Sequence, residues 1–216
     1  MDHLTPHGLD TAAGLLGDGA LVAVPTPRWY MILARAADPH AVTAVFDIKQ
    51  RPEHKPLLLL VDSLATAEQH FRFSRDAHAL AHRLWPGELA LHLPWRTGSG
   101  RLPGIGAPAL VSRPDGILGH LLSLVAEPVA AAACSISAAA ATPDDHPALT
   151  AHQVAAFNTA TGEHLAAVVD GGICPQGRHM TIVDCPDGEP ARLHREGTVH
   201  SRAVTAALTE GVHRVG

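Results

Sequence analysis

A helix is predicted to give way to a buried strand across Asp47-Ile48-Lys49-Gln50-Arg51-Pro52-Glu53-His54-Lys55-Pro56-Leu57-Leu58-Leu59-Leu60-Val61. Three cationic residues, Lys49, Arg51 and Lys55, fall within seven residues at this junction. Pro52 prevents a helix from continuing, and it biases the residue before it towards an extended conformation. Because α/β proteins commonly place ligand sites at such junctions on a sheet edge, the spacing predicts an anion-binding site here.

Local patterns indicate both the helix before this junction and the strand after it. Asp38 is suited to cap a helix, Pro39 suits its first position, and apolar residues recur at one-face spacing as far as Ile48. The run at residues 57–61 is short and wholly apolar, which is typical of a strand buried on both faces of a sheet. We therefore expect a helix over residues 39–49 that leads into a core strand.

A solvated turn is the alternative for the same stretch. A cation at a helix C-terminus is stabilised by the macrodipole by about 0.3–1 kcal/mol, which alone would account for Lys49. Glu53 could also pair with Lys49 or Lys55 at the surface. The turn leaves unexplained why three cations are grouped with two stiffening prolines.

Length and composition are typical of a single globular domain. The chain has 216 residues, of which 46% are apolar and 17% charged, so it can bury a sizeable core. We expect one domain over residues 1–216, with its core at roughly 10–200. The formal charge of −5 argues against general coating of nucleic acid, which needs a basic surface.

The lack of a recognisable targeting pattern and the cysteine usage favour a cytoplasmic protein. No apolar run is long enough to predict a membrane span, and Met1-Asp2-His3-Leu4-Thr5-Pro6 lacks the pattern of a signal peptide. The three cysteines, Cys134, Cys174 and Cys185, are odd in number and show no Cys-x-x-Cys spacing, so reduced thiols are expected.

Histidine is unusually frequent, with sixteen residues. His78 and His82 lie four apart on a predicted helix, but no glutamate lies between them in the HExxH arrangement of zinc proteases. The other histidines are scattered among charged and loop residues. The sequence therefore predicts no dedicated metal site.

Strand and helix patterns interleave along the chain. Apolar runs predict strands at residues 20–24, 57–61, 88–93, 109–111, 164–169, 180–184 and 191–195. Capping residues and one-face spacing predict helices at residues 39–49, 62–69, 74–84, 115–125, 150–162 and 201–210, while 128–134 fits either type. This order predicts an α/β fold with a twisted mixed sheet flanked by helices, because the hairpin around Asp187-Gly188 requires an antiparallel pair.

Residues 94–108 are expected to be a loop. Seven glycines and prolines fall in this segment, and such a composition cannot sustain a strand. We expect a mobile surface loop that takes no part in the core.

Several short motifs, taken together, resemble the YrdC-like family, which includes the threonylcarbamoyl-adenylate synthases of tRNA modification. The motifs are Pro25-Thr26-x-x-x-Tyr30, Lys49-Gln50-Arg51-Pro52-x-x-Lys55-Pro56, Trp85-Pro86-Gly87, Ser135-Ile136-Ser137-Ala138, Asp170-Gly171-Gly172, Thr181-Ile182-Val183-Asp184 and Arg195-Glu196-Gly197. The Lys-x-Arg-Pro block followed by Trp-Pro-Gly is the most specific of them. The resemblance covers roughly residues 10 to 200.

The resemblance implies a nucleotidyltransferase that joins L-threonine, bicarbonate and ATP into threonylcarbamoyl-AMP and releases pyrophosphate. It implies ATP with Mg²⁺ as a substrate complex, no prosthetic group and no metal held by the protein, with a possible partner in tRNA modification. The implied ATP- or phosphate-binding residues are Lys49, Arg51, Lys55, Ser135, Ser137, Thr181 and Arg195, and the implied substrate-binding residues are Thr26, Arg28 and Tyr30. Cations would offset the charge of a triphosphate and a carboxylate that share one pocket.

The chain also departs from the family pattern. Arg28 replaces a threonine, Met31 a glycine and Met180 a serine, while Ala139 and Ala141 replace an asparagine and a serine. The two alanines lose polar side-chain groups that could bind a ligand, the two methionines add bulk and apolar surface, and Arg28 adds a charge. We therefore expect an altered or weakened substrate set, with poor use of L-threonine.

Three alternatives follow for the function. The first is a synthase of the tRNA pathway or a carbamoyl-adenylate-forming relative in another biosynthetic pathway. The second is a non-catalytic nucleotide- or RNA-binding module, which the two alanines favour and the negative net charge disfavours for RNA. The third is a purely structural or partner-binding protein, which no specific sequence feature favours.

Overall fold

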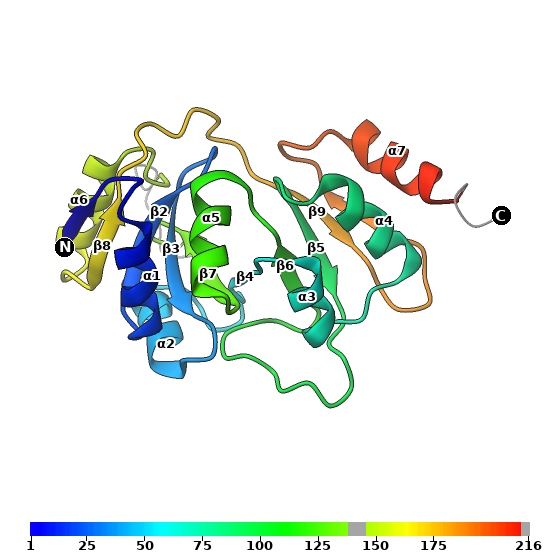
Figure 1. Ribbon diagram of the computed structural model, residues 1–216, viewed down its shortest axis with the longest axis horizontal. Helices are drawn as coiled ribbons and strands as arrows, with labels where there is room; N and C mark the ends of the chain where they lie inside the picture. Colours follow the sequence, from blue (N-terminus) through cyan, green and yellow to red (C-terminus); the bar gives the residue numbers. More distant parts are fainter. Residues whose placement is uncertain (138–145, 213–216) are drawn as a thin grey trace.

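The computed structural model describes residues 1–137 and 146–212, and this part of the chain forms one ten-stranded sheet with seven helices (Figure 1). The strands are β1 (Asp2–Leu4), β2 (Leu21–Pro25), β3 (Tyr30–Arg35), β4 (Leu58–Leu60), β5 (Leu89–Leu93), β6 (Ala109–Ser112), β7 (Val129–Ala133), β8 (Leu165–Val169), β9 (Thr181–Asp184) and β10 (Arg192–Arg195). The helices are α1 (Leu9–Gly17), α2 (Pro39–Ile48), α3 (Leu64–His70), α4 (Arg75–Leu84), α5 (Gly116–Val125), α6 (Ala151–Ala160) and α7 (Ser201–Val212).

The sheet is mixed, with its strands in the order β1-β8-β2-β3-β7-β4-β6-β5-β9-β10. The pairs β1–β8, β2–β8, β4–β6 and β5–β9 are parallel, and the remaining neighbours are antiparallel. This confirms the predicted α/β class, including the antiparallel hairpin of β9 and β10.

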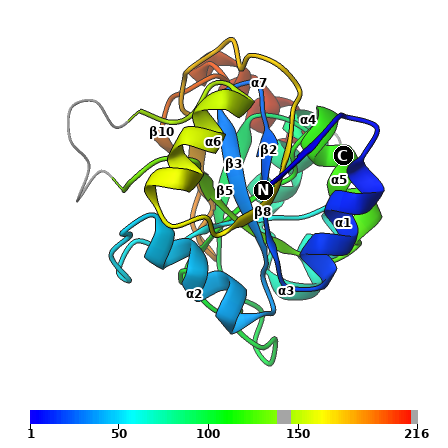
Figure 2. The ribbon, with the colours of Figure 1, turned by 90° about the vertical axis from the view of Figure 1, so that its left-hand side faces the viewer.

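Two core clusters pack on the two faces of the sheet. On β2, Leu21 and Ala23 belong to the first cluster, while Val22 and Val24 belong to the second. Helices α2, α3, α4, α6 and α7 contribute to the first cluster, and α1 and α5 contribute to the second. Figure 2 shows α2 and α6 on one side of the sheet and α1 and α5 on the other. The central strands β2, β4 and β7 contain only apolar residues, as is typical of strands that are covered on both faces.

The predicted helix starts are confirmed by side-chain caps. The capping oxygens belong to Asp38, Ser63, Ser74, Asp115 and Thr150, each of which accepts a backbone N–H from the first turn of its helix. These bonds satisfy donors that a helix start otherwise leaves without a partner. No helix in the described ranges has both the length and the apolar character needed to cross a membrane.

Three elements were not predicted from the sequence. Helix α1 begins at Leu9, and Gly8 before it provides no side-chain cap. Strand β1 is a mostly exposed strand of three residues at the sheet edge, so neither element shows a strong local signal. Strand β3 begins at Tyr30, the last residue of the Pro25–Tyr30 motif, and its apolar run is not among the predicted strands. The ambiguous segment at residues 128–134 forms strand β7.

The loop at residues 94–108 differs in part from its prediction. The segment contains no regular strand or helix, as expected, but the exclusion from the core was wrong. Ile105 belongs to the first core cluster, and Trp95 packs against that cluster and donates its indole N–H to the carbonyl of Gly106 at 2.8 Å. Glycine and proline interrupt a strand, yet they leave the side chains between them free to pack.

Candidate active site

A cavity of ≈ 670 Å³ lies against the sheet face that carries the second core cluster. Its apolar floor includes Met31, Leu58, Leu110, Ala131 and Ala133. Three cations from separate segments line its wall: Arg28 from the β2–β3 loop, Lys49 from the end of α2, and Arg51 from the α2–β4 junction. The fold thus joins an apolar surface to a group of positive charges.

Lys49 is the most buried of these cations, with 2% of its surface exposed. Its ammonium donates to the carbonyl oxygen of Ala133 at 2.5 Å and to the carbonyl oxygen of Ser135. Burial, and after it the positive charge of Arg51, lower the pKa of Lys49 to about 8. An anion bound in the cavity would stabilise the charged form and raise this pKa again.

Arg51 is oriented by the backbone of its own loop. Its Nε donates to the carbonyl oxygen of Lys55 at 2.8 Å, and its second terminal nitrogen donates to that of Pro56 at 2.7 Å. Burial lowers the pKa of Arg51 from its ordinary value. Since a guanidinium carries five N–H groups, donors remain for a ligand in the cavity.

The predicted convergence of cations is found for Lys49 and Arg51, which line one cavity. Lys55 supports Arg51 through its backbone carbonyl, and its side chain lies outside the cavity lining. A direct anion contact by the Lys55 ammonium stays a prediction.

Arg28 is fixed by two neighbours. It is 5% exposed, and its Nε pairs with the carboxylate of Glu88, which precedes β5. The guanidinium carbon lies 4.9 Å from the ring centroid of Trp29, close enough for a cation–π contact. Arg28 therefore places a positive charge in the wall with little freedom to move.

The segment between β8 and β9 passes over one end of the sheet, as Figure 1 shows at the top of the molecule, and brings Gly177 and His179 into the cavity lining. The His179 ring meets the Trp29 ring edge-on, with 5.0 Å between centroids. Burial lowers the pKa of His179, and the charges of Arg195 and Arg28 lower it further. The imidazole is therefore biased towards its neutral form.

Arg195 lies beside this end of the cavity. One of its terminal nitrogens donates to the carbonyl oxygen of Met180 at 3.2 Å. Burial and then the charge of Arg28 lower the pKa of Arg195, so the two guanidinium groups are close enough to repel each other. A β-carbon at Gly197 would come within 2.1 Å of the carbonyl oxygen of His179, which explains why glycine follows Arg195 and Glu196.

Two buried polar atoms of the cavity residues have no hydrogen-bond partner within the described part of the chain. They are the hydroxyl oxygen of Ser137 and the indole nitrogen of Trp29, and both residues line the cavity. Ser137 is 3% exposed, and its backbone N–H donates to the carbonyl of Lys49 at 2.7 Å. Buried polar groups are normally paired, so orphaned atoms beside a cavity indicate a place for a ligand or water.

Three of the predicted site residues use their hydroxyls within the protein. Thr26 donates to the carbonyl of Trp29 at 2.7 Å and thereby shapes the β2–β3 loop. Tyr30 donates to the carbonyl of Gly172 at 2.9 Å, and burial raises its pKa to about 12. Thr181 donates to the carbonyl of Val199 and accepts two backbone N–H groups, which fills the capacity of a hydroxyl. These residues position the loops around the cavity, and a direct contact of their hydroxyls with a ligand stays a prediction.

The departures noted in the sequence fall in different places. Met31 lines the cavity floor next to Arg28, so it does reduce the space there. Met180 packs into the second core cluster instead of the cavity lining. Ala139 and Ala141 lie outside the described residues, and Ser135, the remaining predicted serine, lines the cavity.

The sequence model of the Sua5/YciO/YrdC family, described as "Telomere recombination", matches residues 14–197. The chain belongs to the Sua5/YciO/YrdC family. The match spans both the α2–β4 junction and the late hairpin, in agreement with the motifs from which the resemblance was predicted.

Relatives in the Sua5/YciO/YrdC family carry the name of one enzyme. Threonylcarbamoyl-AMP synthase of Pyrococcus abyssi is 32% identical over 190 residues, which are 86% of this chain and 53% of that protein. A putative threonylcarbamoyl-AMP synthase of Mycobacterium tuberculosis is 31% identical over 209 residues, 94% of this chain and 89% of that protein. This chain spans about half the length of the P. abyssi relative.

Among solved structures of the Sua5/YciO/YrdC family, the P. abyssi Sua5 structure complexed with L-threonine matches with a TM-score of 0.81 at 28% identity. The match covers 97% of this chain and 61% of the other. The chain therefore shares the overall fold of that structure.

Sequence reasoning missed three residues of the candidate site. Trp29 lies inside the Pro25–Tyr30 motif, so its position next to Arg28 was a usable signal. Glu88 and His179 gave none, because Glu88 meets Arg28 across sixty positions of sequence and His179 reaches the cavity on the long β8–β9 segment.

Proposed function

We propose that the chain binds ATP in the ≈ 670 Å³ cavity and forms a carbamoyl-adenylate, with L-threonine as the first acceptor to test. One observation supports this above the others. Lys49, Arg51 and Arg28 share a single cavity with the orphaned polar atoms of Ser137 and Trp29. Cations and unpaired donors on an apolar floor suit a nucleotide, which has both a polyphosphate and a flat base.

In the proposed reaction, the amino group of the amino acid condenses with bicarbonate to a carbamate with loss of water, and a carboxylate oxygen of that carbamate attacks the α-phosphorus of ATP. The bond from that phosphorus to the β-phosphate oxygen breaks, and pyrophosphate leaves with its electron pair. Lys49 and Arg51 would offset charge on the phosphates as the α-phosphorus is attacked. No carboxylate lines the described part of the cavity, so Mg²⁺ would arrive bound to the phosphates of ATP.

Pyrophosphate release tests this proposal. The protein is incubated with ATP, Mg²⁺, bicarbonate and L-threonine, and each component is then omitted in turn. We expect release that needs both bicarbonate and an amino acid. ATP binding without any turnover would instead favour the non-catalytic nucleotide-binding module, and RNA binding without ATP binding would favour the RNA version.

The acceptor pocket is expected to use L-threonine poorly because of Arg28 and Met31, which line the cavity. Arg28 adds a positive charge and Met31 adds bulk where the family pattern has a threonine and a glycine. Each lost polar contact lowers discrimination for the matching substrate. We expect pyrophosphate release with L-threonine to rise in the double variant Arg28→Thr/Glu88→Gln, which removes the charge and its partly buried partner together. The expectation would be contradicted if the unaltered chain turned over L-threonine as fast as, or faster than, other amino acids.

The orphaned hydroxyl of Ser137 gives a direct test of the ligand site. Ser137→Ala is expected to weaken ATP binding about fivefold, the value of one neutral hydrogen bond of ~1 kcal/mol. The melting temperature should not fall, because this hydroxyl has no partner within the described residues. Ser123→Ala is the matched control, since that hydroxyl lies on the surface of α5 and donates only to the carbonyl of His120. An unchanged ATP affinity for Ser137→Ala would remove this contact from the site.

A further inference from the structure

Three potential metal ligands come together at the β9–β10 end of the sheet. His92 and Asp184 are joined by a hydrogen bond of 2.5 Å between the imidazole Nδ1 and a carboxylate oxygen. The Nδ1 of His194 lies 3.2 Å from the other oxygen of Asp184. One ligand atom from each of the three residues lies within 4.8 Å of the other two.

The sheet register explains this grouping. Strands β5 and β9 pair in parallel, with His92 opposite Asp184. Strand β10 pairs antiparallel with β9, and an irregularity in register at Leu193 to Arg195 brings His194 beside the same carboxylate. The two imidazole rings meet edge-on, with 5.2 Å between their centroids. Three adjacent strands therefore hold the ligands, which makes their arrangement part of the fold.

We propose that His92, Asp184 and His194 bind a divalent transition-metal ion of the zinc type. Two imidazoles and one carboxylate suit Zn²⁺, Co²⁺ or Ni²⁺, whereas Mg²⁺ prefers oxygen ligands alone. Tetrahedral zinc with bonds of about 2.0–2.1 Å separates its ligand atoms by about 3.3 Å. The Nδ1 of His194 lies 3.2 Å from one oxygen of Asp184, and the Nδ1 of His92 lies 2.5 Å from the other. Because one ligand atom from each residue lies within 4.8 Å of the other two, side-chain adjustments of about 1–2 Å would bring them to this spacing.

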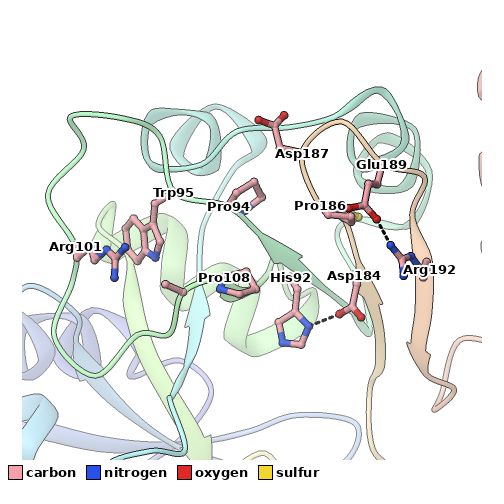
Figure 3. Close-up of a pocket in the computed structure, with 12 residues that line it drawn as sticks. His92, Pro94, Trp95, Arg101, Pro108, Asp184, Pro186, Asp187, Glu189 and Arg192 are labelled. Carbon is pink, nitrogen blue, oxygen red and sulfur yellow. Dashed lines mark hydrogen bonds and ion pairs between the residues drawn. The ribbon is translucent and has the colours of Figure 1, made fainter.

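The proposed site borders a second cavity, of ≈ 540 Å³. Figure 3 shows His92 and Asp184 directed towards each other in its wall, with Trp95 and Arg101 farther along the loop and Arg192 on the neighbouring strand. Three protein ligands leave a tetrahedral ion with one open position, which a water or a small ligand in this cavity can fill. Among the described residues, none lines both the second cavity and the candidate active site, so the two sites can be tested separately.

No local pattern in the sequence indicates this site. His92 precedes Asp184 by 92 positions and His194 follows it by ten, so no short spacing such as HExxH joins the three residues. The expectation of no dedicated metal site rested on spacing along the chain, whereas this grouping depends on the β5–β9–β10 pairing.

Titration with a single metal tests the proposal. The full chain, first freed of metal with a chelator, is titrated with Co²⁺ and followed by visible absorption, and then with Zn²⁺ in calorimetry. We expect one equivalent to bind, with the absorption of a low-symmetry Co²⁺ complex and a rise in melting temperature. His92→Gln/His194→Gln should weaken binding by at least about 10-fold, since even indirect partners of a metal site are worth that much.

The matched control is His78→Gln/His82→Gln, which removes the stacked histidine pair on α4 whose rings lie 6.1 Å apart. This variant should bind Co²⁺ as the unaltered chain does. The single variant His194→Gln, at a half-exposed position on the edge strand, guards against loss of folding in the double variant. Equal affinity in the unaltered chain and the His92/His194 variant would overturn the proposal, as would loss of binding in the control alone.

Discussion

Replacing Lys49 with methionine is expected to reduce the affinity for ATP about 100-fold while the protein stays folded. Hydrogen bonds to charged groups contribute roughly 1.5–3 kcal/mol, and the burial of Lys49 favours the upper end of that range. Methionine removes one donor from the carbonyl of Ala133, which keeps the backbone N–H of Ser135, and it removes the lysine donor from the carbonyl of Ser135. It also removes the cost of a buried charge. These effects oppose each other, so the free energy of unfolding should change by no more than about 1–2 kcal/mol.

The pKa of Lys49 gives the same prediction a pH dependence. Its pKa is lowered to about 8 in the folded chain from an ordinary 10.5, so between these values the unfolded chain holds a proton that the folded chain has lost. The contribution of Lys49 to stability therefore rises with pH in this window. Bound phosphates favour the ammonium, so ATP affinity should be highest below pH 8 and should fall as pH rises above it.

Calorimetry in buffers of different ionisation enthalpy measures the proton taken up with ATP near pH 8 to 9. The neighbouring Cys134 does not interfere, because burial raises its pKa to about 12. In Lys49→Arg, proton uptake in this range should vanish because the guanidinium stays protonated. Unaltered ATP binding in Lys49→Met, or persistent proton uptake in Lys49→Arg, would show that Lys49 does not face the phosphates.

The parts of the fold that the sequence predicted are those with a local cause. Helix α2 could be placed because Asp38 caps it, Pro39 opens it and Pro52 lies beyond its end, all within one segment. The mixed character of the sheet followed from a single turn dipeptide between β9 and β10. Helix α1 escaped prediction because it is held by packing against α5 and the sheet, which its sequence does not show.

The site was predictable only as far as its residues share a segment. Lys49 and Arg51 lie two positions apart, so their common cavity could be expected. The motifs also include Thr26 and Thr181. A motif does not show that the hydroxyl of such a residue is already hydrogen-bonded within the protein. The pairing of Arg28 with Glu88 joins residues sixty positions apart, and for this reason no pattern in the sequence indicated it.

Replacing Arg51 with alanine is expected to weaken ATP binding by ~1.5–3 kcal/mol, which corresponds to roughly 10- to 150-fold. Two effects add in this variant. One is the loss of a charged contact to the phosphates. The other is the release of the carbonyls of Lys55 and Pro56, which the guanidinium now holds at 2.8 and 2.7 Å. Isothermal titration with ATP in the presence of Mg²⁺ measures the combined loss.

Arg51→Lys separates the two effects. A lysine keeps the charge but cannot reproduce the planar fork of donors that reaches both carbonyls and a ligand. Its affinity should therefore lie between those of the unaltered chain and Arg51→Ala. Arg101→Ala serves as the control, because Arg101 lines the other cavity and should leave ATP binding unchanged. A contact in the cavity must distinguish the two arginines. If Arg51→Ala and Arg101→Ala lost the same ATP affinity, the role of Arg51 would be reduced to general attraction by net charge.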